Sequence, residues 1–89
     1  MDMGNSELSK FPELSAAKKA VGFNQTKKAV NSGKAKKVYA AKDADGLFLL
    51  QIKRLCESKS VPLDESATMS ELGTVCGIEV DCAVCAIIE

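Results

Sequence analysis

Two short and almost unbroken apolar runs constrain the fold of this chain most, because each has the length of one buried β-strand. They are KVYAA at residues 37–41 and CAVCAII at residues 82–88. A strand that is covered on both faces is apolar throughout, whereas a strand with one solvated face alternates apolar and polar residues. The segments between the runs carry helical patterns, and strands separated by helices favour an α/β sandwich.

The best-defined helical pattern follows a turn at residues 43–46. Phe48, Ile52, Leu55 and Cys56 recur at positions i, i+4, i+7 and i+8, which places them in one apolar stripe. Polar residues occupy the other side, and Asp45 is suited to cap the helix at its N-terminus. We therefore predict an amphipathic helix that packs its stripe against the sheet.

Shorter signals predict the other elements. Residues 12–19 predict a helix, because Pro12 is suited to its first turn. Residues 61–63 predict a short strand whose proline places it at a sheet edge or at a strand start. Residues 68–71, with the sequence TMSE, are a capping box that opens a short helix, and Gly77 ends that helix.

The chain length and the lack of a long apolar stretch limit the architecture. A sequence of 89 residues suits one domain with a modest core, and no apolar run approaches the about 18–20 residues that a membrane-spanning helix needs. The polar and acidic start of the chain does not resemble a signal peptide. We predict a flexible N-terminal lead over residues 1–11 and a single domain over residues 12–89, and we expect a cytoplasmic monomer without a membrane partner.

The charges of the chain are balanced in number but not in position. Residues 1–42 hold nine lysines and three acidic residues, whereas residues 43–89 hold three basic and nine acidic residues. The halves therefore carry net charges of +6 and −6, although the whole chain is neutral. Such a protein can present one basic face to phosphate, because phosphate binding depends on the local field. The alternative is that the lysines only solvate helix faces.

The four cysteines favour packing over metal binding or disulfides. The pair Cys82-x-x-Cys85 stands without a histidine in the chain, and Cys56 and Cys76 stand alone in the sequence. A structural zinc site needs four converging ligands. Residues three apart on a strand face opposite sides of the sheet, so we expect Cys82 and Cys85 to point away from each other as small buried hydrophobes. We predict no metal, no disulfide and no cofactor.

The sequence carries no signature of an enzyme. A cysteine nucleophile usually depends on a histidine base, and the chain has no histidine. It also lacks the glycine-rich loop and lysine of a phosphate-binding motif. The carboxylates of Asp43 and Asp45 precede a helix, where capping accounts for them. We therefore expect a protein that binds a partner and catalyses no reaction.

The most informative segment is GFNQTKK at residues 22–28, which follows a very short apolar piece at residues 20–21. Its glycine, two amides and two lysines lie at the expected N-terminus of a helix that ends at Gly33. Helix N-termini attract phosphate, and amide and lysine side chains can bind base edges. The alternative is purely structural: Asn24 caps the helix, Gly22 makes a turn and the lysines are solvated.

The order of several motifs resembles the ribosomal protein L7Ae family. The stretch GFNQTKKAVNSG at 22–33 is similar to the family's glycine–asparagine–glutamate–x–x–lysine helix, and AKDADG at 41–46 to its acidic turn after a strand. VP at 61–62, LGTVCGIEV at 72–80 and the terminal apolar strand follow in family order. The resemblance covers residues from about 14 to 89 and is strongest to the short bacterial branch, which lacks a C-terminal helix.

This resemblance implies a three-layer α-β-α sandwich with a mixed four-stranded sheet and a role in binding kink-turns. Kink-turns are sharply bent elements of structured RNA, ribosomal or other, with tandem sheared G·A pairs, and DNA is not an expected partner. The implied RNA-binding residues are, from the helix, Gly22, Asn24, Gln25, Lys27 and Lys28, and from a later loop, Ile78, Glu79 and Val80. In this scheme the helix contacts guanines and phosphates, and the loop covers an unstacked nucleotide.

Two departures from the family pattern affect the expected affinity. Gln25 stands where many members have glutamate, so an acceptor remains but its charge is lost. The recognition loop contains Glu79 and Asp81 and no basic residue, and acids near phosphate are unfavourable. The acidic second half and the zero net charge of the chain favour a competing interpretation, a protein-interaction module of the same fold without RNA binding.

Overall fold

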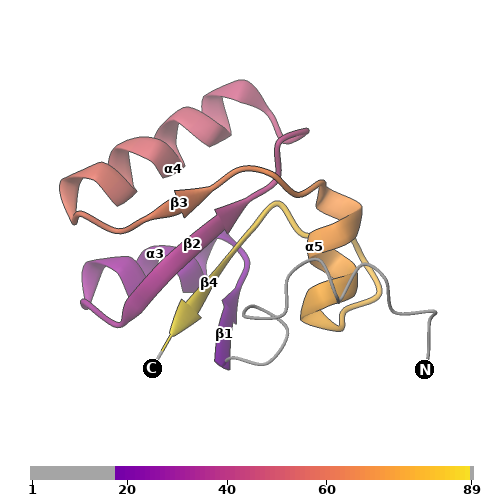
Figure 1. Ribbon diagram of the computed structural model, residues 1–89, viewed down its shortest axis with the longest axis horizontal. Helices are drawn as coiled ribbons and strands as arrows, with labels where there is room; N and C mark the ends of the chain where they lie inside the picture. The colour runs from indigo at the N-terminus through magenta and orange to yellow at the C-terminus, as the bar shows by residue number, and fades with distance from the viewer. Residues whose placement is uncertain (1–17, 89) are drawn as a thin grey trace.

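The computed structural model describes residues 18–88 (Figure 1). Its elements in chain order are β1 (Lys18–Val21), α3 (Phe23–Asn31), β2 (Ala35–Ala40), α4 (Gly46–Ser58), β3 (Leu63–Asp64), α5 (Met69–Cys76) and β4 (Val84–Ile88). The two apolar runs correspond to β2 and β4, so the sequence predicted the two inner strands of the sheet.

The strands form one mixed sheet in the order β1-β4-β2-β3. The C-terminal strand β4 runs antiparallel to both β1 and β2, whereas β3 runs parallel to β2 at the edge. The short strand predicted at residues 61–63 is thus present, begins at Leu63 and lies at a sheet edge. Its proline precedes the strand, where the missing N–H group interrupts no ladder.

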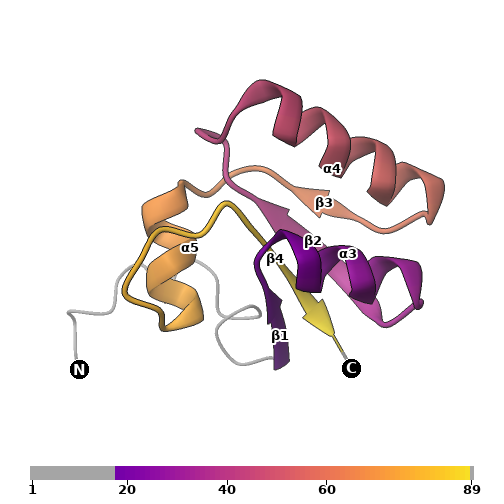
Figure 2. The same cartoon turned by 180° about the vertical axis from the view of Figure 1, so that it is seen from behind.

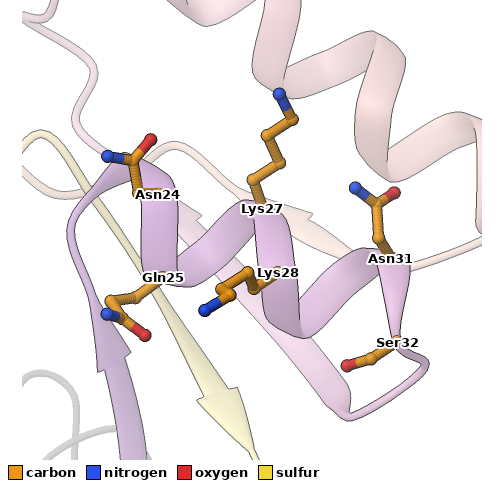
Figure 3. A pocket seen from close by; sticks show the side chains of 6 residues that line it. All are labelled: Asn24, Gln25, Lys27, Lys28, Asn31 and Ser32. Atoms are coloured by element: carbon orange, nitrogen blue, oxygen red, sulfur yellow. The ribbon is translucent and has the colours of Figure 1, made fainter.

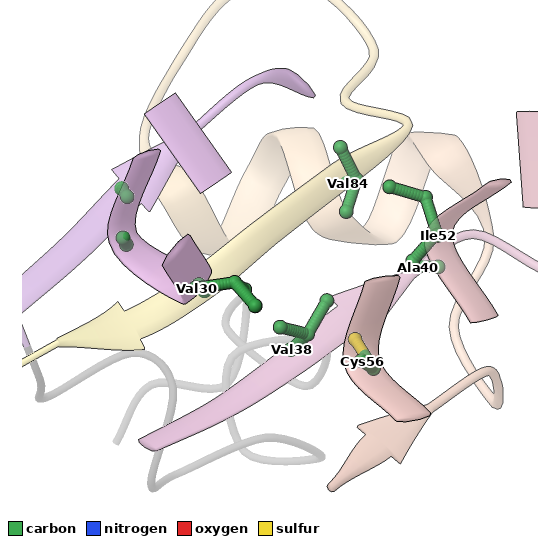
Figure 4. Packing of buried hydrophobic residues seen from close by; sticks show 9 residues of the cluster. Val30, Val38, Ala40, Ile52, Cys56 and Val84 are labelled. Atoms are coloured by element: carbon green, nitrogen blue, oxygen red, sulfur yellow. The ribbon is translucent and has the colours of Figure 1, made fainter. Parts of the chain in front are cut away.

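Helices cover both faces of the sheet, which gives the three layers expected from the family resemblance (Figures 1 and 2). Val38 and Ala40 of β2 pack with α3 and α4 on one face, as Figure 4 shows. Their neighbours Tyr39 and Ala41 belong to a second core with α5 on the other face. This alternation explains why the strand sequences are apolar throughout. In the part of the chain that the structure describes, no helix has the length and apolar character to cross a bilayer.

The caps of α4 and α5 follow the predictions from their sequences. The Asp45 carboxylate accepts hydrogen bonds from the backbone N–H groups of Leu47 at 3.1 Å and Phe48 at 3.3 Å. Thr68 and Glu71 form the reciprocal capping box, and Gly77 ends α5 in the left-handed conformation at φ 75°. These caps could be predicted from the sequence, because each depends only on residues within one helical turn.

The predicted helix at residues 12–19 lies mostly outside the described residues. Its last two positions, Lys18 and Lys19, are wrong as helix, because they begin β1 and lie opposite Ile88 and Ile87 of β4. The two lysines gave no strand pattern of their own. Pairing with the buried strand β4 decides their conformation, and such a long-range contact overrides a weak local preference.

We predict that Ile52→Ala destabilises the protein by about 2–5 kcal/mol, because it removes a fully buried side chain from the core between α4 and the sheet. Leu47→Ala on the same helix is the matched control, since Leu47 is 72% exposed, and we expect it to change stability by less than about 0.5 kcal/mol. Chemical denaturation followed by circular dichroism measures both. Equal losses for the two variants would contradict this assignment of the core.

Candidate nucleic-acid interface

Helix α3 begins at a tight turn made by Gly22, not at Asn24. Gly22 has a φ of 95°, a conformation that side chains rarely adopt, and it turns the chain from β1 directly into the helix. Its N–H group donates to the Val84 carbonyl oxygen at 3.0 Å, and its carbonyl oxygen accepts from Thr26 N–H at 3.0 Å. The prediction that Asn24 caps the helix is wrong, because Asn24 already lies inside the first turn. Its amide is therefore available to a partner.

The inner side of α3 fixes the helix on the sheet. Thr26, Ala29 and Val30 are buried, and the Thr26 hydroxyl donates to the Ala20 carbonyl oxygen at 3.4 Å. The helix ends before Gly33, as predicted, with φ 78° at that glycine. Because the inner side chains are anchored to β1 and the core, the outer side chains of α3 have a defined position on the surface.

The outer side of α3 is a polar, basic surface around one hollow (Figure 3). The residues that line the hollow are Asn24, Gln25, Lys27, Lys28, Asn31 and Ser32. The helix contains no acidic residue, so its positive N-terminal dipole and its lysines act in the same direction. Asn31 and Ser32 were not predicted as site residues. The sequence did contain an indication of both residues. They lie seven positions after Asn24 and Gln25, and residues seven apart lie on the same side of a helix.

The two lysines of α3 differ in their surroundings. Lys27 extends toward α4 in Figure 3, and its Nζ lies 5.9 Å from the centre of the Phe23 ring. Phe23 in turn packs on Phe48 of α4, with 5.4 Å between the ring centres. Lys28 extends from the same side of the helix as Gln25. Lys28 and Gln25 therefore form the more direct pair for a ligand, while Lys27 contributes charge from the neighbouring side.

Residues 77–81, which follow α5 in the loop that leads to β4, expose apolar atoms. Val80 is 69% exposed and Ile78 is 37% exposed, and Glu79 and Asp81 are also exposed. The N–H group of Ile78 donates to the Gly73 carbonyl oxygen at 3.1 Å, which ties the start of the loop to α5. An exposed apolar pair flanked by acids suits contact with a flat apolar group better than contact with phosphate.

A close backbone approach holds this loop against α5. Gly73 is buried in the helix, and a Cβ atom there would overlap the carbonyl oxygen of Val80 and lie 3.3 Å from the Asp81 Cα. The loop can occupy its position only because residue 73 has no side chain. The sequence did not reveal this role of Gly73, because the contact joins a residue of α5 to residues of the loop that follows the helix.

The predicted site residues fall into two groups near one end of the sheet. Gly22, Asn24, Gln25, Lys27 and Lys28 lie at the junction of β1 and α3. Ile78, Glu79 and Val80 lie on the loop that leads to β4. The bond from Gly22 N–H to the Val84 carbonyl oxygen links the two segments. Each group has its own surface, and the strand pairing of β1 with β4 sets their relative position.

The predicted separation of Cys82 and Cys85 is wrong. The Sγ atoms of Cys76, Cys82 and Cys85 all lie within 4.8 Å of one another. Strand β4 begins at Val84, so Cys82 lies in the preceding loop and the alternation of strand side chains does not apply to it. Cys76 joins the pair from the end of α5, whereas Cys56 packs in the core on the opposite face. The buried character expected of Cys82 and Cys85 is confirmed.

The three neighbouring thiols bind their protons unequally. Hydrogen bonding with Cys76 and Cys85 lowers the pKa of Cys82, and the backbone N–H groups of Val84 and Gly22 add to this effect. Hydrogen bonding with Cys76 and Cys82, together with burial, raises the pKa of Cys85. In its neutral form the Cys82 thiol donates to the Val84 carbonyl oxygen at 3.1 Å. These hydrogen bonds favour a thiolate at Cys82 and the neutral thiol at Cys85.

The layers and the sheet order define a small α-β-α sandwich that presents a polar and basic helix surface. The model of the ribosomal protein L7Ae/L30e/S12e/Gadd45 family matches residues 8–89, and the chain belongs to this family. The resemblance drawn from the sequence motifs is thus confirmed.

Bacterial relatives and solved structures agree with this assignment. The chain is 45% identical over 69 residues to RNA-binding protein TTE2299 of Caldanaerobacter subterraneus subsp. tengcongensis, covering 78% of this chain and 84% of that protein. It is 37% identical over 76 residues to RNA-binding protein GWCH70_0105 of a Geobacillus species, covering 85% and 93%. A 15.5 kD RNA-binding protein of Giardia lamblia superposes with a TM-score of 0.76 at 30% identity, covering 100% of this chain and 78% of that one.

We predict that Gly73→Ala displaces the loop at residues 77–81 and lowers stability by about 1–3 kcal/mol, because the added methyl group meets backbone atoms. The matched control is Gly46→Ala in the first turn of α4, where a Cβ atom meets nothing within 4 Å. There we expect unchanged or slightly higher stability, by at most about 1 kcal/mol. Amide chemical shifts of the loop and denaturation curves measure both effects. A loop whose shifts stay the same in Gly73→Ala would contradict the close approach.

Proposed function

We propose that this protein binds structured RNA and recognises kink-turns through α3 and the loop at residues 77–81. The observation that carries the proposal is the outer side of α3, which combines exposed amides, lysines and a helix N-terminus without an acidic residue. Family membership and the RNA-binding names of its relatives support it. The proposed role is that of a binding protein without catalytic activity, whose partner is ribosomal RNA or another structured RNA.

In this proposal α3 supplies both base contacts and phosphate contacts. Asn24 and Gln25 offer donors and acceptors to the edges of the G·A pairs, and Lys28 donates to guanine or phosphate oxygens. Gly22 lets the RNA backbone come close to the helix N-terminus, because it carries no side chain. Lys27, placed toward α4, strengthens the positive field.

The loop supplies a second, apolar contact. The exposed side chains of Ile78 and Val80 suit the face of a base that has left the stack at the bend. Glu79 and Asp81 repel phosphate, so the loop fits a position where the RNA presents a base and its backbone turns away. Such a loop favours a bent RNA over a regular duplex, whose bases are stacked.

A protein-interaction module is the second candidate, and the acidic loop is the observation that favours it. Ile78 and Val80 expose apolar surface beside Glu79 and Asp81. An apolar patch bordered by acids can equally contact a basic protein surface. Retention of one protein partner after nuclease treatment would favour this candidate, whereas steep salt dependence of RNA binding favours the first.

We predict a clear preference for a short kink-turn RNA over a twin in which Watson–Crick pairs replace the sheared G·A pairs. Fluorescence anisotropy at two salt concentrations measures both affinities. Lys28→Ala should weaken kink-turn binding by about 1–3 kcal/mol and reduce the salt slope by about one. The matched control Lys53→Ala removes one positive charge from α4, where Lys53 pairs with Glu65 at 3.9 Å near the β3 edge, and should leave the affinity nearly unchanged. Equal and feeble binding to both RNAs would refute the proposal.

We also predict that Asn24→Ala separates recognition from stability. Asn24 does not cap α3, so its loss should change unfolding free energy by less than about 0.5 kcal/mol, whereas loss of a true cap costs about 1 kcal/mol. Discrimination between the kink-turn and its twin should fall by about 1–3 kcal/mol. Gln51→Ala, which removes an exposed amide from α4, is the control. Unchanged discrimination in Asn24→Ala would remove Asn24 from the recognition surface.

A further inference from the structure

We propose that Cys76, Cys82 and Cys85 form a binding site for one thiophilic d10 metal ion, zinc(II) or copper(I), at the base of the recognition loop. The three sulfur atoms converge within 4.8 Å of one another. They come from three separate pieces of the fold: the end of α5, the loop before β4 and the strand β4 itself. Within residues 18–88 this is the one group of three or more potential metal ligands that converge in this way.

The spacing of the sulfur atoms is close to that of a metal–thiolate site. A zinc–sulfur bond of about 2.3 Å in tetrahedral geometry separates ligand sulfurs by about 3.8 Å. Side-chain rotation alone can close the remaining gap from 4.8 Å. Cys76 is half-buried and lies at a helix end, so it has the most freedom to adjust, while the two other cysteines are fixed.

The backbone positions of Cys82 and Cys85 are held by the sheet and by α5. Cys85 lies opposite Val21 of β1 and Tyr39 of β2 in the strand register. The N–H group of Cys82 donates to the Met69 carbonyl oxygen at 3.0 Å. Preorganised ligands favour metal binding, because little conformational entropy is lost when the ion enters.

The chemistry of the donors selects the class of ion. Thiolates prefer zinc(II) and copper(I), whereas magnesium and calcium prefer oxygen ligands. Three thiolates alone satisfy the trigonal geometry of copper(I). Zinc(II) requires a fourth ligand, and a water molecule can supply it from the side of Cys76, where the cluster is partly open. Both ions share the same three protein donors, and the experiment distinguishes them.

The position of the cluster gives the ion a structural consequence. Cys76 and Cys82 lie on either side of residues 77–81, so one ion bound to both would hold the two ends of this loop together. The loop carries Ile78 and Val80, the apolar pair assigned above to an unstacked base. We infer that the bound ion orders the loop and thereby strengthens RNA binding, a step that rests on the proposed function.

Cobalt(II) titration of the reduced full-length protein tests the site directly. We expect one equivalent to bind with sulfur-to-cobalt charge-transfer bands and the intense visible bands of a tetrahedral thiolate site. Zinc(II) should then displace the cobalt and bleach these bands. A parallel titration with copper(I), against a chromophoric copper(I) chelator, shows which ion binds more tightly.

Cysteine variants assign the ligands. Cys76→Ser should weaken cobalt(II) binding by at least about 100-fold, since loss of even an outer-shell partner costs about 10–100-fold. Cys56→Ser is the control, because Cys56 is also a free cysteine but lies buried in the other core, and it should retain the spectrum. Circular dichroism verifies that both variants are folded. The site would be overturned if neither cobalt(II) nor copper(I) gave thiolate charge transfer. It would also be overturned if Cys76→Ser and the unaltered protein gave equal spectra.

The same preparations test the link to RNA. Kink-turn affinity, measured with and without one bound zinc(II) ion, should rise with the ion in the unaltered protein and in Cys56→Ser, but not in Cys76→Ser. If the ion binds and the RNA affinity stays the same, the site stands and its coupling to the loop is refuted. If neither form binds the kink-turn, the proposed function fails while the metal site stands.

Discussion

The pairing of β4 between β1 and β2 is the interaction on which the rest of the structure depends. This last strand of the chain is buried on both faces, with Val84 and Ala86 in one core and Cys85 and Ile87 in the other. It hydrogen-bonds to two neighbours, so both helical layers are connected through it. Because parts of the chain far apart in sequence meet on β4, residues that are ordinary in their local context become neighbours beside this strand.

The turn at Gly22 shows how this strand positions the proposed RNA surface. The Val84 carbonyl oxygen at the start of β4 accepts the Gly22 N–H bond, and the chain then enters α3 without an intervening loop. A glycine in this conformation lets the helix begin at Phe23, two residues earlier than a side-chain cap at Asn24 would. This start of the helix matters for the proposed RNA surface, since a capping asparagine would use its oxygen on the helix backbone. Here the amide instead faces outward with Gln25 along the hollow of α3.

The parts of the fold that the sequence predicted correctly are those with local causes. Asp45 and Thr68 cap helices because their partners lie two or three residues away, and the stripe containing Ile52 is a property of one helix. The predictions that were wrong involve partners distant in sequence. Lys18 became strand through pairing with Ile88, and Cys82 turned toward Cys85 because β4 starts after it. The residues on the outer side of α3 could be predicted in outline, because the helical repeat places residues at fixed spacings on one side. The same repeat would have predicted that Asn31 and Ser32 lie on that side.

The opposite charges of the two halves of the chain lie on different parts of the structure. The lysines of α3 lie on a helix without acidic residues, whereas Glu79 and Asp81 lie in the exposed loop that also carries Ile78 and Val80. A uniformly basic face would bind any duplex, since phosphate attraction carries no sequence information. In the proposed binding mode, an acidic and apolar loop together with a basic helix penalises RNA whose backbone continues straight across both. The neutral total charge is therefore compatible with the proposed selective binding, in which repulsion at the loop adds discrimination and attraction at the helix adds affinity.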